Sequence, residues 1–361
     1  AMARGASPLL FSACAWAAAV TTIAAGACGL GASVRGHWSS EAPASGAHAF
    51  SREELTAMRQ QAAGAPRGRF GKLLHKEFHQ AVGDADVEAE TNRDVQRFLN
   101  CFAKGSYVMP HLHPEAGKWE VFVHTDGDFQ VAAYDPALAA NDSSNVLETA
   151  RLSEEVPLIF VQEGTWHAIA AMDAGGAVEF EFKPGPYGGV VKDKVFSWQQ
   201  ERPWAYDETS EQLKPLLPDF VAKLEAAKGS RASDPATQLA SYQQLRPYTR
   251  QELLAMLPSG QQHVNIGNTG PGDIVPRATL LLVRSTPGGG PQQAVLPQAA
   301  KARWGIYAWL AGGPVHVGGQ TVGPEAPLLE LRGEDFEAAQ RDGLVPAAGE
   351  GGVVLELTAS Q

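Results

Sequence analysis

Short segments in which apolar and polar residues alternate, separated by glycine and proline, dominate the pattern of this chain. Residues 178–182 (VEFEF) alternate most clearly, with an apolar face and a face that carries Glu179 and Glu181. A period of two is typical of a β-strand that buries one face, so we expect both glutamates to face solvent. The alternative is that they face the interior, where one of them could act as a general base.

Two stretches have the pattern of helices. Ser51 and Glu54 form a capping box ahead of Leu55, which predicts a helix that begins after Ser51. Residues 206–247 form the second stretch, which we expect to be a helical linker between two domains. The 38 glycines, 24 prolines and low charged fraction indicate many turns between short strands. The chain as a whole is therefore predicted to be mainly β, with short helices.

The second half of the chain repeats part of the first. Residues 248–256 (YTRQELLAM) match residues 50–58 (FSREELTAM), which indicates an internal duplication. We therefore expect a second domain over residues 248–361.

The first residues differ in composition from the rest. Arg4 is followed by a run without charged residues, a pattern typical of a targeting sequence over residues 1–35. We expect an exported or organelle-targeted protein, with a retained membrane anchor and a buried helix as the alternatives. Residues 36–48 then form a linker, and residues 49–205 form the first domain.

The overall charge limits the kinds of partner that we expect for this protein. The net charge is −11 and no cluster of lysine and arginine is present, so the chain lacks the basic surface of a nucleic-acid binder. Three cysteines (Cys14, Cys28 and Cys101) give no disulfide framework. Cys101 lies in an apolar run, and we interpret it as a small buried side chain.

Candidate chemistry is concentrated in residues 105–127. His111 and His113 are two residues apart in a segment of strand formers, so both imidazoles point to one face. Glu120 opens the next apolar run, and the turn between the runs predicts a hairpin that brings its carboxylate beside the histidines. His167 follows a glycine turn further along the chain. Three imidazoles and one carboxylate suit a divalent transition metal such as iron, manganese or zinc better than calcium or magnesium.

Alternation also predicts the neighbours of these ligands. If the two histidines face the interior, Tyr107 and Met109 do as well, and if the glutamate does, so does His124. His124 and Tyr134 are our candidates for a catalytic proton carrier near the metal. The alternatives are a histidine bonded to a backbone carbonyl and a tyrosine that only packs in the core.

The second half lacks the ligand set. Residues 304–312 align with residues 119–127, with a tryptophan first and a glycine last in both. This alignment puts Gly305 in place of the glutamate, and Leu296 and Gln298 in place of the two histidines. We therefore expect a degenerate second domain that holds no metal and serves as a structural or pairing domain. An unrelated β-domain is the alternative.

The motifs around the ligands resemble those of the cupins. The glycines, histidines and glutamate of residues 105–127 resemble the first cupin motif, and QEGTWH (residues 162–167) resembles the second. The segments RGRFGKLLH, DVQRFLN, SYVMPHLHP, KWEVFV, GTWH and KPGPY resemble, in the same order, those of WbuC-type cupin-fold metalloproteins over residues 50–205. This resemblance implies a double-stranded β-helix (jelly-roll) barrel and, with the repeat, a bicupin. The metal would be held by His111, His113, Glu120 and His167.

These observations favour a metal-dependent enzyme, because such a ligand set leaves coordination positions open. We expect an oxygenase with a redox metal, or an isomerase with zinc or manganese, that acts on a small hydroxylated or carbonyl compound. The WbuC-type resemblance, associated with surface-polysaccharide gene clusters, implies a sugar or nucleotide-sugar substrate. The alternatives are a ligand-binding or sensor module without catalysis, and a barrel kept for its interfaces in a homodimer.

Overall fold

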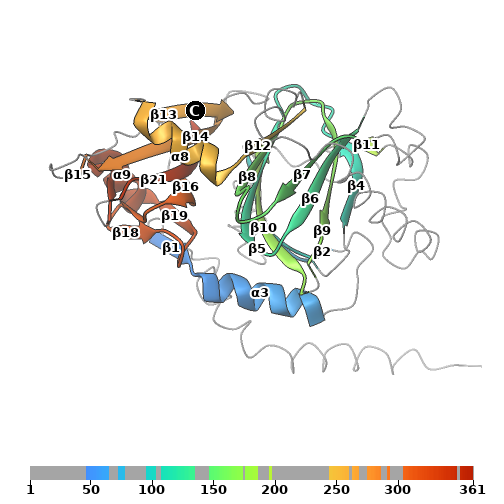
Figure 1. The fold of residues 1–361 in the computed structure, drawn as a ribbon, viewed down its shortest axis with the longest axis horizontal. Helices are drawn as coiled ribbons and strands as arrows, with labels where there is room; N and C mark the ends of the chain where they lie inside the picture. Colours follow the sequence, from blue (N-terminus) through green and yellow to red (C-terminus); the bar gives the residue numbers. More distant parts are fainter. Residues whose placement is uncertain are drawn as a thin grey trace, which may run out of the picture.

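The computed structural model shows two β-sandwich units side by side (Figure 1). It describes residues 46–64, 72–77, 95–102, 107–134, 146–173, 175–185, 195–196, 244–259, 262–267, 275–285, 291–292, 304–347 and 350–360. The expected targeting segment and nearly all of the expected helical linker lie outside these ranges. Within them, no helix is long and apolar enough to cross a membrane.

Eight consecutive strands form the first unit. They divide between two sheets, with the orders β3-β10-β5-β8 and β4-β9-β6-β7. This order is that of a jelly roll, so the expected mainly β, jelly-roll fold is confirmed here. β2 (Lys72–Glu77) extends the first sheet beside β3, and β11 (Val195–Phe196) extends the second beside β4. The eight strands are β3 (Val95–Phe102), β4 (Tyr107–Leu112), β5 (Glu120–Asp126), β6 (Phe129–Tyr134), β7 (Val146–Leu152), β8 (Leu158–Val161), β9 (Trp166–Ala171) and β10 (Ala177–Pro184).

The larger sheet of the second unit has the same strand order as the larger sheet of the first. Its order β19-β16-β21-β14-β13 corresponds strand for strand to β8-β5-β10-β3-β2. The facing sheet has three strands, β18-β17-β20, and a helix, α9, packs against β19 and β16. The elements are η3 (Leu257–Ser259), β13 (His263–Gly267), β14 (Val275–Ser285), β15 (Pro291–Gln292), β16 (Trp304–Gly312), β17 (Val315–Val317), β18 (Gln320–Val322), β19 (Leu328–Arg332), α9 (Gly333–Asp342), β20 (Leu344–Pro346) and β21 (Gly352–Ser360).

Each unit receives a strand from the sequence that precedes the other unit. β1 (Gly46–Phe50) precedes the first unit but pairs with β19 of the second. β12 (Leu245–Tyr248) precedes the second unit but pairs with β8 of the first. Residues 46–48 therefore belong to a strand, and the prediction that the linker extends to residue 48 is wrong. The predicted linker ended too late because its small polar residues carry no strand signal.

A helix follows each exchanged strand. α3 (Arg52–Gly64) packs on β3, β5 and β10, whereas α8 (Arg250–Met256) packs on β16 and β21. The Ser51 hydroxyl accepts a hydrogen bond from the amide of Glu54 at 3.1 Å, and Thr249 caps α8 in the same way. The predicted helix start at Ser51 is confirmed.

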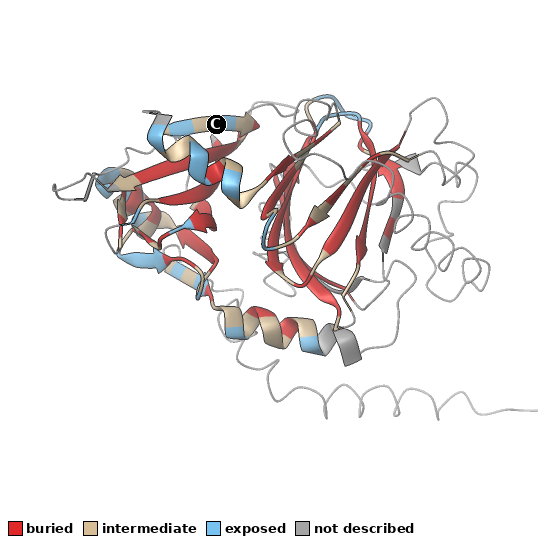
Figure 2. Ribbon diagram, in the orientation of Figure 1, coloured by how far each residue is buried: buried red, intermediate tan, exposed pale blue. Residues whose placement is uncertain are grey.

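The larger sheets of the two units pack face to face. The apolar residues between them form one continuous core, and separate clusters fill the interior of each unit. Figure 2 shows that most strand residues are buried. A central strand of either larger sheet therefore has both faces buried. The shared core includes Val121, Val123, Phe180 and Phe182 from the first unit and Ile306, Ala308, Leu355 and Leu357 from the second.

Candidate metal centre

The pairing of β4 with β9 brings two of the predicted ligands together. His111 lies directly opposite His167, and opposite residues of an antiparallel pair project from the same face. A bulge between Val108 and His111 shifts the alternation of β4 by one residue. Val108 consequently packs in the interior cluster. The side chains of Tyr107 and Met109, which alternation places inside, lie outside the described part of the structure.

The other two ligands meet at the start of β5. Glu120 lies opposite Val161, a member of the interior cluster, so its carboxylate projects into the unit. Nε2 of His113, just after β4, lies 2.8 Å from Oε1 of that carboxylate. Nδ1 of His167 lies 2.8 Å from the carbonyl oxygen of Thr165. A carbonyl only accepts, so Nδ1 donates the hydrogen bond and Nε2 points toward Glu120.

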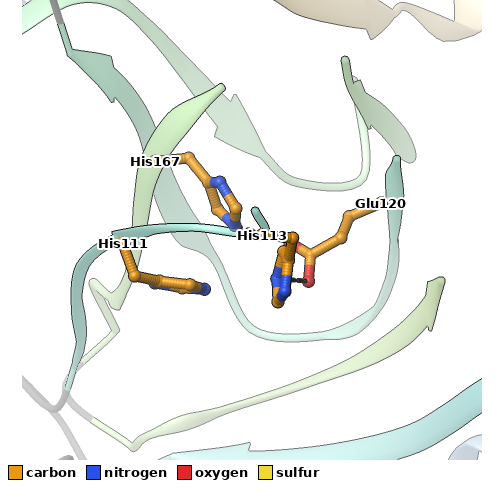
Figure 3. Close-up of side chains that lie close together, drawn as sticks. All are labelled: His111, His113, Glu120 and His167. Carbon is orange, nitrogen blue, oxygen red and sulfur yellow. Dashed lines mark ion pairs between the residues drawn. The ribbon is translucent and has the colours of Figure 1, made fainter. Parts of the chain in front are cut away.

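All four predicted ligands converge in the interior of the first unit. Their ligand atoms lie within 4.8 Å of one another, and all four residues are buried. Figure 3 shows the three rings and the carboxylate around a common centre. The residues concerned are His111, His113, Glu120 and His167.

The arrangement fits a divalent transition metal ion. Oε2 of Glu120 and Nε2 of His167 are buried and lie 2.6 Å apart, and neither has another hydrogen-bond partner among the described residues. A positive charge must lie between two such atoms, either a proton on the ring or a metal ion that both atoms bind. Three imidazole nitrogens and one carboxylate oxygen suit iron, manganese or zinc.

Glu120 is ionised despite its burial. Desolvation acts to raise its pKa, but the Lys183 ammonium, followed by His113 and His167, outweighs that effect and holds the pKa well below its ordinary value. The site therefore presents the charged form of the carboxylate, which is the form that binds a metal ion.

The acidic face of β10 points inward, which corrects the expectation that it faces solvent. Glu179 and Glu181 are buried, and Asn100 Nδ2 donates a hydrogen bond to each, at 2.6 Å and 2.7 Å. The opposite face of β10 packs against the second unit, so neither face meets water. Lys183, on the inner face as well, donates to Glu181 Oε1 at 2.7 Å.

Sequence reasoning missed Asn100 and Lys183 as residues around the site. A signal for Lys183 was present, because Glu179, Glu181 and Lys183 occupy every second position of one strand. Charges of both signs on one strand face are consistent with internal pairing as well as with solvation. Nothing in the sequence indicated Asn100.

His124 lies on the inner face of β5 but away from the four ligands. It is four residues from Glu120, about 13 Å along the strand. It is buried, and its Nε2 lies 4.0 Å from Oδ1 of Asp128. Burial lowers its pKa, which favours the neutral ring. Its role as a proton carrier stays a prediction.

Tyr134 lies on the other face of its strand from the ligands. On β6 it is opposite Trp166, whereas its neighbour Ala133 is opposite His167. Adjacent residues of a strand point to opposite faces, so the side chains of Tyr134 and His167 diverge. A catalytic role for Tyr134 stays a prediction without support from this placement.

Comparisons with known proteins add few constraints. A family model described as "Domain of unknown function (DUF6016)" matches residues 50–146, and no curated protein matches the chain. Similar solved structures include salicylate 1,2-dioxygenase from Pseudaminobacter salicylatoxidans, with 11% identity and a TM-score of 0.45 over 88% of this chain and 84% of that one. A mutant of that enzyme in complex with gentisate has 11% identity and a TM-score of 0.44, over 97% and 92%. A mutant of oxalate decarboxylase OxdC from Bacillus subtilis has 13% identity and a TM-score of 0.34, over 73% and 68%. At TM-scores below 0.5, none of these similarities decides the chemistry of this chain.

Proposed function

We propose that this chain is a cupin-type metalloenzyme that holds one divalent transition metal ion in its first unit and acts on a small hydroxylated or carbonyl compound. The observation that carries the proposal is the convergence of four buried ligands, with Oε2 of Glu120 and Nε2 of His167 2.6 Å apart. Four protein ligands leave one or two coordination positions for a substrate oxygen.

The surrounding residues have separate tasks in this proposal. Thr165 fixes the ring of His167 with Nε2 toward the ion. Glu120 is ionised and acts as a ligand rather than as the general base. The apolar cluster below the ligands keeps water out of the interior, which strengthens electrostatic interactions there. When bound, the ion supplies Lewis acidity or, if it is iron or manganese, redox chemistry.

We also propose that the second unit is a degenerate copy of the first that holds no metal. The matching strand orders of the two larger sheets support this duplication. Gly305 stands at the position of Glu120 and has no donor atom. A Cβ atom on Gly305 would lie 2.5 Å from the ring of Phe336, which fills the space above it. The finer WbuC-type assignment, with a sugar substrate, rests on the ordered motifs of residues 50–205.

The metal content of the purified full-length chain tests the proposal. We expect one equivalent of a transition metal in the wild type and its loss in His111→Ala and in His167→Ala. His263→Ala changes an exposed histidine of β13 and serves as the matched control. A wild-type chain that takes up no stoichiometric metal would leave only a structural role for the barrel.

Turnover separates an enzyme from a binding module. We expect the iron-loaded chain to consume oxygen, or the zinc- or manganese-loaded chain to convert substrate, with members of a panel of small hydroxylated and carbonyl compounds. The activity should be lost in Glu120→Ala. A compound that binds tightly and is recovered unchanged would identify a sensor or carrier instead.

We further propose that residues 1–35 direct export or organelle targeting, on the pattern of their sequence. Fusion of this segment to a cytoplasmic reporter should relocate the reporter. A reporter that stays in place would refute the proposal.

A further inference from the structure

Lys183 is a buried lysine on the face of β10 that points toward the metal ligands. Phe182 lies opposite Val121 on β5, so the next position of β10 faces Glu120. Nζ of Lys183 donates to Oε1 of Glu120 at 2.7 Å and lies 3.5 Å from Nε2 of His113. A cation is thus built into the edge of the ligand cluster.

Non-ligand groups hold this cation in place. Lys183 also donates to Oε1 of Glu181 at 2.7 Å, and Asn100 holds the other oxygen of Glu181 at 2.7 Å. All of these side chains are buried. Burying a charge is costly unless it is paired, so the network fixes the ammonium between two carboxylates.

The two oxygens of Glu120 are divided between this cation and the ligand cluster. Oε1 faces Lys183 and His113, whereas Oε2 lies 2.6 Å from Nε2 of His167. A metal ion bound through Oε2 would share one carboxylate with a fixed ammonium group. Like charges this close in a buried site repel each other strongly.

The second unit shows the same position without the lysine. The pair of Glu356 with Tyr307 corresponds to the pair of Glu181 with Phe122, so Thr358 stands where Lys183 stands in the first unit. The second unit therefore has Gly305 and Thr358 at the positions of Glu120 and Lys183. At the position of Glu181 stands Glu356, whose pKa is raised to about 7 by burial.

We propose that Lys183 is an internal counter-ion of the metal site. It compensates the charge of Glu120 when no metal is bound, and it competes with the metal for that carboxylate once one binds. This inference rests on the proposed metal site and adds a device that weakens metal binding. The lysine therefore makes the metal-free protein stable and the metal exchangeable.

Competition titrations with Zn²⁺ at pH 7, on the full chain freed of metal, test the inference. We expect Lys183→Met to lower the melting temperature of the metal-free protein and to bind Zn²⁺ at least about tenfold more tightly than the wild type. A residue that merely supports a ligand has the opposite effect, since its loss typically weakens binding about 10–100-fold. Unchanged or weaker binding in Lys183→Met would overturn the inference.

Two further variants keep the result interpretable. Lys183→Met/Glu181→Gln also removes the second buried charge, and it should show the same tighter binding. If a Lys183 variant folds only when Zn²⁺ is added, that result supports the counter-ion role of Lys183. Arg97→Met removes a buried cation from β3 that lies opposite Phe182, on the face away from the site, and should leave Zn²⁺ affinity unchanged. A wild type that binds no Zn²⁺ refutes the proposed function, whereas a binding wild type with no gain in the variants refutes only the role of Lys183.

Discussion

A Cβ atom added to Gly305 would lie 2.5 Å from Cε2 of Phe336. Gly305 stands where Glu120 stands in the first unit, and Phe336 comes from α9, the helix between β19 and β20. The first unit has only four residues between the corresponding strands β8 and β9. The second unit thus has an aromatic ring against the position that corresponds to Glu120, and its interior is packed as an apolar core.

Gly305→Ala should destabilise the protein by about 1–3 kcal/mol, because the added methyl group overpacks the ring of Phe336. Chemical denaturation of the full chain measures the change. Phe336→Leu opens space beside the added methyl group. The double variant should therefore be destabilised by less than the sum of the destabilisations of the two single variants. Strict additivity would contradict the contact.

Stability should fall as the pH rises from about 5 to 8, because of Glu356. Burial raises the pKa of this carboxyl to about 7 from its ordinary value of 4.5, although Tyr307 and Gln340 bond to its Oε1 at 3.2 Å and 3.0 Å. The folded state binds the proton more tightly, so this contribution is complete below pH 4.5 and is lost as the pH passes 7. The difference corresponds to about 3 kcal/mol.

Glu356→Gln should remove that dependence and make the protein more stable than the wild type at pH 8. Urea denaturation at pH 5 and pH 8 gives the comparison. Glu350→Gln, at an exposed position, is the matched control. Equal pH profiles for Glu356→Gln and the wild type would show that another group is responsible.

Zn²⁺ at about 100 times its dissociation constant should stabilise the wild type by about 2.7 kcal/mol, since the ion binds the folded state. His167→Ala should lose this gain, whereas His263→Ala should keep it. Thermal unfolding with and without Zn²⁺ is the measurement. An equal gain in both variants would indicate that Zn²⁺ binds elsewhere.

A single cut introduced between residues 206 and 243 should leave the two fragments associated. β1 of the N-terminal fragment pairs with β19, β12 of the C-terminal fragment pairs with β8, and the larger sheets share one core. Size-exclusion chromatography of the cut protein should give one peak near the elution volume of the intact chain. Two separate peaks at physiological salt would contradict the exchange of strands.

The four metal ligands could be predicted because their signal is local. Two histidines at i and i+2 share a strand face whatever the rest of the fold does, and a hairpin places Glu120 nearby. The bulge before His111 was invisible, because an extra residue in one strand becomes apparent only when the partner strand is known. Alternation therefore placed His124 on the inner face of β5 correctly, but it could not show that Val108 packs in the interior.

The burial of Glu179 and Glu181 could not be predicted for a different reason. Their strand has one apolar face, which sequence reasoning assigned to the core of its own domain. In the structure that face meets the second unit, and the polar face lies inside the first. A strand between two cores looks amphipathic in the sequence whenever one core contains a buried charge network.

The repeat at residues 50 and 248 was visible in the sequence. The exchange of the strands next to it, β1 and β12, between the two units was not.

The exchange of β1 and β12 makes each half of the chain part of the fold of the other half, whether or not both halves carry chemistry. A deletion that removed the C-terminal half would also remove β12, leave the edge of β8 bare and uncover the outer phenylalanines of β10. A substitution in the C-terminal half changes one side chain, whereas loss of the whole half removes a strand and a buried surface from the N-terminal unit. The two halves are therefore inherited as a single folding unit.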